Sequence, residues 1–130
     1  MDAYEQSRVT RLEHVNTTIV EKPQEGIAIV ADRIAKLINR REANGQKTVL
    51  SLASGRSMRD LFVELVRLHK EEGLSFKNVV VFGSYEFYPL AYSSLGSMAQ
   101  IQSQLLDHID ILPENVHTFP GDLPKETVCT

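Results

Sequence analysis

The stretch TVLSLASGRSMRDLFVELVRL, residues 48–68, decides the fold. Thr48–Ala53 has the β-branched and aliphatic composition of a strand, and the Ser-Gly-Arg segment after it indicates a tight turn. Ser57 and Asp60 then have the spacing of a variant N-cap pair. One face of the helix that follows is marked by Leu61, Phe62, Leu65, Val66 and Leu68. A strand that turns directly into a helix is the first half of a βαβ unit.

A helix precedes this unit and a second strand follows it. Pro23 suits the first turn of a helix, and apolar residues recur every three or four positions until Gly45 ends the pattern. Asn78–Phe82 is a short continuous apolar run, typical of a strand that is covered on both faces. Thr17–Val20 predicts a short edge strand ahead of the first helix.

The rest of the chain repeats the alternation of helix and strand. The apolar spacing of a third helix is given by Met98, Ile101, Leu105 and Ile109. Val116–Phe119 predicts a third strand, and Leu123–Glu126 predicts the start of another helix. We therefore expect one α/β domain over residues 1–130, a Rossmann-like three-layer sandwich with a mainly parallel sheet. A sheet of three core strands and a helix cut at Thr130 suggest truncation.

Composition excludes several functional classes. Hydrophobic residues make up 42%, charged residues 24%, and the net charge is −3, which favours a globular domain and gives no reason to expect nucleic acid or an anionic membrane as partner. The single cysteine, Cys129, cannot form an internal disulfide, and no Cys/His cluster indicates a metal. Met1–Thr10 lacks the apolar segment of a signal peptide, and Val79–Phe82 is far too short to span a membrane. We expect a cytoplasmic protein.

Ligands of open α/β sheets bind beyond the carboxyl ends of the strands, and two loops qualify here. In the first, Gly55 lets the backbone approach a ligand, and the start of the next helix suits a phosphate. Ser54 and Ser57 add hydroxyl groups, and Arg56 adds a positive charge. Taken alone, these residues fit a plain βα turn with Ser57 as N-cap better, because few such turns bind phosphate.

The second loop, Gly83–Leu90, is polar and aromatic. Glu86 is its carboxylate, so it could act as a base, accept a sugar hydroxyl or hold the loop. The alternative is a small surface cluster of aromatic side chains, with Glu86 paired to a basic neighbour. Among the histidines, we expect His69 to be solvated and His117 to be partly buried, and none has triad spacing.

Longer stretches resemble glucosamine-6-phosphate deaminases, from about Pro23 to Pro124. The similarity is carried by VLSLASGRSM at residues 49–58, HKEEGLSFKNVVVF at 69–82 and HIDILPENV at 108–116. The resemblance implies a Rossmann-like fold shared with ribose-5-phosphate isomerases and 6-phosphogluconolactonases. It also implies an enzyme of amino-sugar metabolism that converts glucosamine 6-phosphate and water to fructose 6-phosphate and ammonia, without a metal or redox cofactor.

Both loops depart from the family pattern. The family's phosphate loop usually reads Thr-Gly-small-Ser/Thr-Pro, so the resemblance assigns phosphate binding to Ser54, Gly55, Arg56 and Ser57, with a bulkier arginine. The second loop usually reads Phe-Asn-x-Asp-Glu-Tyr, which places Tyr85 at the position of the proton-abstracting Asp, beside Glu86. A phenol, with an ordinary pKa near ~10, is a poor base at neutral pH. The family's Asp-Gly-His motif and downstream Glu would lie after Thr130.

Two main readings of the function remain open, with a third beside them. In the first, the chain is part of a deaminase and is inactive alone. In the second, it belongs to a non-catalytic relative that binds a hexosamine or hexose phosphate. A weaker, third reading is a related sugar-phosphate isomerase or 6-phosphogluconolactonase. Apolar surface left uncovered by a missing half would favour a homo-oligomer.

Overall fold

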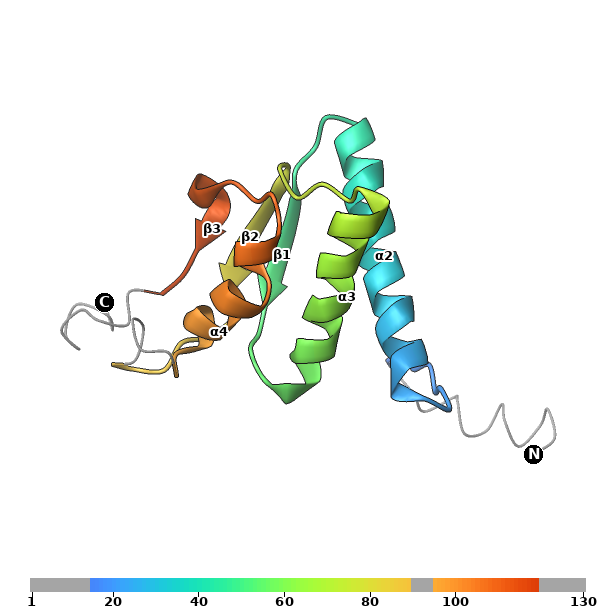
Figure 1. Ribbon diagram of the computed structural model, residues 1–130, viewed down its shortest axis with the longest axis horizontal. Helices are drawn as coiled ribbons and strands as arrows, with labels where there is room; N and C mark the ends of the chain where they lie inside the picture. Colours follow the sequence, from blue (N-terminus) through green and yellow to red (C-terminus); the bar gives the residue numbers. More distant parts are fainter. Residues whose placement is uncertain (1–14, 90–94, 120–130) are drawn as a thin grey trace.

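The computed structural model describes residues 15–89 and 95–119 (Figure 1). In chain order the elements are α2 (Pro23–Ala43), β1 (Thr48–Leu52), α3 (Arg56–Glu72), β2 (Val79–Gly83), α4 (Ser97–Gln104), the short 3-10 helices η1 (Leu106–His108) and η2 (Pro113–Asn115), and β3 (Val116–His117). The predicted edge strand at Thr17–Val20 is wrong, because these residues form no strand. The predicted helix start at Leu123–Glu126 and Cys129 lie outside the described residues.

The three strands form one parallel sheet in the order β1-β2-β3. Thr48 pairs with Val79 at one end of β1 and Leu52 with Gly83 at the other, so β1 and β2 are paired along their full length. The connections β1-α3-β2 and β2-α4-β3 step in the same direction across the sheet. Because such connections are right-handed, α3 and α4 lie on the same face. The predicted α/β architecture with a parallel sheet is confirmed.

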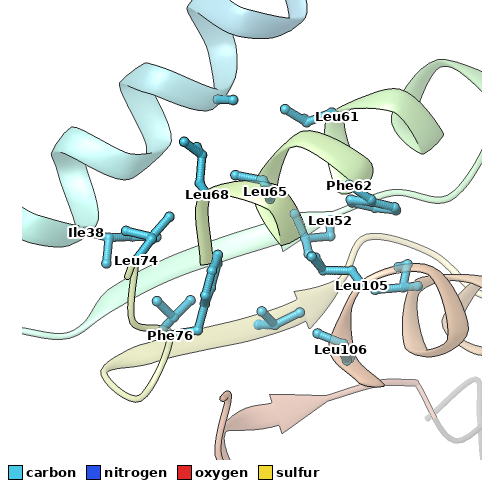
Figure 2. Packing of buried hydrophobic residues seen from close by; sticks show 14 of the residues in the cluster. Ile38, Leu52, Leu61, Phe62, Leu65, Leu68, Leu74, Phe76, Leu105 and Leu106 are labelled. Carbon is cyan, nitrogen blue, oxygen red and sulfur yellow. The ribbon is translucent and has the colours of Figure 1, made fainter. Parts of the chain in front are cut away.

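The hydrophobic core lies between this face of the sheet and the helices (Figure 2). Phe62 and Leu65 of α3 are completely buried, and α2 packs beside α3 through Ala31 and Ile38. The predicted third stripe is confirmed in the core at Met98, Ile101 and Leu105, although α4 ends at Gln104 and η1 continues the turn. Of the helices in residues 15–89 and 95–119, none is long and apolar enough to cross a membrane.

The opposite face of the sheet is open over the described residues. Val49 of β1 is 62% exposed and Phe82 of β2 is 45% exposed. The expectation that the second strand is covered on both faces is therefore wrong for this part of the chain. Its side chains alternate between buried and exposed, because every described α-helix that contacts the sheet lies on the core side. The second helical layer of the expected sandwich is not among the described residues.

At the amino edge of the sheet, the Asp110 carboxylate clamps the turn between α3 and β2. It accepts hydrogen bonds from the Phe76 N–H (2.6 Å) and the Ser75 hydroxyl (2.9 Å), and His69 Nδ1 lies 3.6 Å away. His69 is half-buried rather than solvated, because its Nδ1 donates to the Leu74 carbonyl at 2.6 Å. These residues come from two of the stretches that carry the family resemblance, so that part of the similarity encodes packing.

Asp110 makes the stability of the protein depend on pH. Partial burial alone would raise the pKa of Asp110, but the hydrogen bonds from Phe76 and Ser75 and the proximity of His69 outweigh it and hold the pKa below its ordinary value. A depressed carboxylate pKa gives stability that is present above the unfolded pKa, near ~3.9, and lost as the pH falls through the folded pKa.

We therefore expect Asp110→Asn to lower the free energy of unfolding at pH 7 by about 1–2 kcal/mol. The loss should stay below the ~3 kcal/mol that a hydrogen bond to a charged group can contribute, because the Asp110 carboxylate is partly solvated. Urea denaturation at pH 7 and at pH 3 measures the difference, which should shrink at the lower pH. Glu114→Gln, at an exposed carboxylate on η2, is the control and should change little. A pH-independent Asp110→Asn effect would contradict this account.

Candidate functional site

The two loops singled out in the sequence leave the same edge of the sheet. Leu52 and Gly83 are paired at the carboxyl ends of β1 and β2, and the Ser84 N–H donates to the Leu52 carbonyl at 2.8 Å. The hydroxyl oxygens of Ser51 and Ser84 lie 2.8 Å apart. The two loops are therefore neighbours at the edge where parallel α/β sheets place their ligands.

In the first loop, the helix begins earlier than the sequence indicates. α3 starts at Arg56, and Gly55 is its N-cap with φ 132° and ψ 172°, a conformation that is nearly exclusive to glycine. The predicted N-cap at Ser57 is wrong: Ser57 lies inside the first turn, and no side chain caps the helix. Gly55 makes the early start feasible, because it turns the chain sharply enough for the next residue to be helical.

This start leaves backbone donors and positive charge at the loop. The first N–H groups of a helix have no carbonyl partner one turn earlier, and the helix dipole adds a partial positive charge. In α3 the Met58 N–H is already bonded to the Gly55 carbonyl at 3.2 Å, so the donors left are those ahead of it. Arg56 and Ser57 are exposed, whereas Ser54 is buried with 9% of its surface accessible. The first turn of α3 carries no acidic residue that would repel an anion.

Tyr85 of the second loop reaches back to the first. Its Oη donates to the Ser54 carbonyl at 2.9 Å and lies 3.0 Å from the Ser54 Oγ. The ring packs edge-on against Phe87, with centroids 5.5 Å apart. The structure thus joins Ser54 to Tyr85, but among the described contacts none joins Arg56 or Ser57 to the second loop.

Glu86 is bound to the start of α4. Its Oε1 accepts the backbone N–H groups of Phe87 (2.8 Å) and Ser97 (2.7 Å), and its Oε2 accepts that of Met98 (3.0 Å). Among residues 15–89 and 95–119, no basic side chain pairs with Glu86, so the suggested ion pair is not found in this part of the chain. Glu86 caps a helix that begins eleven positions later, a separation that no local capping motif spans.

A small hollow that sequence reasoning missed adjoins this edge. It has a volume of about 130 Å³ and is lined by Phe82, Gly83, His117, Thr118 and Phe119. His117 stacks on Phe82 with ring centroids 4.8 Å apart, and it is exposed rather than partly buried as expected. The sequence predicted two short strands, which does not show that Phe82 and His117 are paired side by side.

A second, apolar hollow of about 340 Å³ lies between the starts of α2 and α3. Pro23, Gly26 and Ile27 line it from α2, and Ser57 and Met58 line it from α3. Met58 thus faces this hollow at the position where the family loop usually has proline. Among the described residues, no group of three or more His, Cys, Asp or Glu side chains could hold a metal ion.

Comparison with known proteins finds glucosamine-6-phosphate deaminases among the relatives of this chain. The chain is 42% identical over 128 residues to a glucosamine-6-phosphate deaminase-like protein of Bacteroides thetaiotaomicron, covering 98% of this chain and 19% of that protein. It is 35% identical over 99 residues to glucosamine-6-phosphate deaminase of Porphyromonas gingivalis, covering 75% and 38%. No protein-family model matches the chain.

Solved structures share the fold. A monomeric glucosamine-6-phosphate deaminase superposes with a TM-score of 0.80 at 24% identity, covering 88% of this chain and 47% of that one. A 6-phosphogluconolactonase of Thermotoga maritima gives 0.66 at 22% identity, covering 79% and 45%. The chain spans less than half the length of each of these proteins. Over most of its own length, this chain is homologous to the glucosamine-6-phosphate deaminases.

Proposed function

We propose that the loop Ser54–Ser57 seats the phosphate of a hexosamine or hexose phosphate. The observation that carries this proposal is the Gly55-capped start of α3 at the carboxyl edge of a parallel sheet, in a chain homologous to glucosamine-6-phosphate deaminases. Backbone N–H groups and the helix dipole supply the charge complementarity, and the exposed Arg56 guanidinium adds a positive charge.

In a complete protein, this seat would belong to a glucosamine-6-phosphate deaminase-like enzyme of amino-sugar metabolism, acting in the cytoplasm. The reaction would convert glucosamine 6-phosphate and water to fructose 6-phosphate and ammonia. It needs a base beside the sugar carbonyl and an acid for ring opening. Since the chain spans well under half of the related deaminases, the groups for ring opening would come from outside it.

A non-catalytic, sugar-phosphate-binding role is the second candidate, and one observation favours it. At the position where the resemblance expects an Asp base, the Tyr85 hydroxyl is bonded to Ser54. The neighbouring carboxylate of Glu86 accepts three backbone N–H groups and holds α4. Both side chains thus have structural duties that compete with proton abstraction.

Ligand binding tests the phosphate seat. Calorimetric titration should detect glucosamine 6-phosphate but not glucosamine. Gly55→Ala should weaken binding by about tenfold or more, because the non-glycine residue strains the loop by ~1–3 kcal/mol. A Cβ at this position meets no atom within 4 Å, so the effect would be conformational and not a clash.

Gly73→Ala is the matched control for that variant. Gly73 also has a positive φ, 73°, but it ends α3 at the far edge of the sheet. The substitution should lower stability and leave the affinity for glucosamine 6-phosphate unchanged. Equal loss of affinity in the two variants, or no binding by the unaltered protein, would refute the proposed seat.

Turnover separates the two candidate functions. The 130-residue chain alone should release no ammonia from glucosamine 6-phosphate. In the complete protein, ammonia release by the unaltered sequence favours the enzyme, whereas release that appears only after Tyr85→Asp favours a relative that has lost its base.

A further inference from the structure

The Tyr85 hydroxyl is engaged at both its donor and its acceptor sites by a single residue. A phenol has one hydrogen, and the Ser54 carbonyl oxygen at 2.9 Å can only accept it. The 3.0 Å contact must then be donated by the Ser54 hydroxyl to the Tyr85 oxygen. Tyr85 therefore holds both the backbone and the side chain of Ser54.

This arrangement fixes a peptide plane in the loop. The carbonyl and the following N–H of a trans peptide point in opposite directions. With the Ser54 carbonyl held toward Tyr85, the Gly55 N–H must point away from the tyrosine. Glycine has the widest choice of backbone conformations of any residue, and Gly55 adopts φ 132°. The hydrogen bond from Tyr85 to the preceding carbonyl therefore restricts the conformations that Gly55 can adopt.

The chemistry of the latch requires a donor. An ionised Asp, which the family resemblance expects at this position, only accepts hydrogen bonds and would be repelled by the Ser54 carbonyl. Tyrosine supplies the donor, and its ring is supported by the edge-on contact with Phe87. Tyr85 stands where the family resemblance expects an Asp base, and it makes a hydrogen bond to the Ser54 carbonyl that an ionised Asp could not make.

We propose that Tyr85 is a positioning residue that latches the Ser54–Ser57 loop into its anion-binding conformation. The inference rests on the proposed function, because it assumes that this loop holds the phosphate. It goes further in assigning to Tyr85 a part in affinity rather than in proton transfer.

Tyr85→Phe tests the latch, because it removes the hydroxyl and keeps the ring. The dissociation constants for glucosamine 6-phosphate and for inorganic phosphate should both rise about three- to tenfold, the value of a neutral hydrogen bond. Binding is measured well below the melting temperature of each variant, where a loss of stability alone leaves the affinity unchanged. An effect on the sugar phosphate alone would overturn the latch, since the loop contacts the phosphate.

Two further variants sharpen the test. Tyr88→Phe, at an exposed tyrosine of the same loop, should leave both affinities unchanged. Ser54→Ala combined with Tyr85→Phe should weaken binding by less than the product of the single effects, because the variants share one hydrogen bond. If the unaltered protein binds and Tyr85→Phe binds equally well, the latch is wrong and the phosphate seat stands. If the unaltered protein binds neither probe, the latch and the seat both fail.

Discussion

Phe62→Ala is expected to lower the free energy of unfolding by about 3–5 kcal/mol, the range for truncating a buried aromatic side chain. Phe62 has no exposed surface and lies in α3 where the helix faces the sheet (Figure 2). Removal of the ring loses its transfer free energy and leaves a cavity that the surrounding side chains fill only in part. Because native proteins have a free energy of unfolding of only about 5–15 kcal/mol, this loss would be a large fraction of the stability of the protein.

Urea denaturation of Phe62→Ala beside Val63→Ala measures this effect. Val63 is the next residue on the same helix but is 63% exposed, so its truncation should change stability by less than about 0.5 kcal/mol. Both variants have similar helix propensity effects, so their difference isolates burial. Equal losses in the two variants would mean that α3 does not pack on the sheet through Phe62.

Glu86→Ala is expected to cost about 2–3 kcal/mol, because three backbone N–H groups lose a charged acceptor and the start of α4 loses its cap. The Ser97 N–H and Met98 N–H would be left without their acceptor in a partly buried position. Amide hydrogen exchange should therefore speed up at these two residues first, before global unfolding.

Glu86→Gln is the matched control for the cap. The amide oxygen can still accept two N–H groups, while its NH₂ group would face a third donor, so the loss should be roughly half that of Glu86→Ala. A Glu86→Ala variant with unchanged stability and unchanged exchange at Ser97 would show that Glu86 is free at neutral pH. The reading of Glu86 as a base would then regain support.

The parallel sheet could be predicted from the sequence because each βα unit is locally encoded. Apolar periodicity predicted the helices that begin at Pro23 and Arg56, the second of them slightly late. Composition predicted strands at Thr48–Ala53 and Asn78–Phe82, each within one residue of the observed bounds. The edge strand predicted at Thr17–Val20 is wrong because local composition is not enough: a short β-branched run forms a strand only where an open sheet edge accepts it. The exposure of Phe82 likewise depends on whether a second layer of helices covers its face of the sheet, which the sequence of the strand does not encode.

The proximity of the two loops could be predicted from the sequence, but the hydrogen bonds between them could not. The carboxyl ends of parallel strands share one edge of the sheet, so both loops were expected at that edge. The bonds from Tyr85 to Ser54 and from Glu86 to Ser97 join residues 31 and 11 positions apart, and neither separation has a sequence signature. Gly55 at the N-cap was missed because serine is a far commoner cap, and only φ reveals the choice.

Backbone amide resonances during titration with glucosamine 6-phosphate test the phosphate seat most directly. We expect the largest shifts at Gly55, Arg56 and Ser57, with smaller ones at Tyr85 through its bonds to Ser54. Inorganic phosphate should shift the same three amides, and glucosamine should not. Saturable shifts confined to residues away from the start of α3, or none at all, would contradict the account.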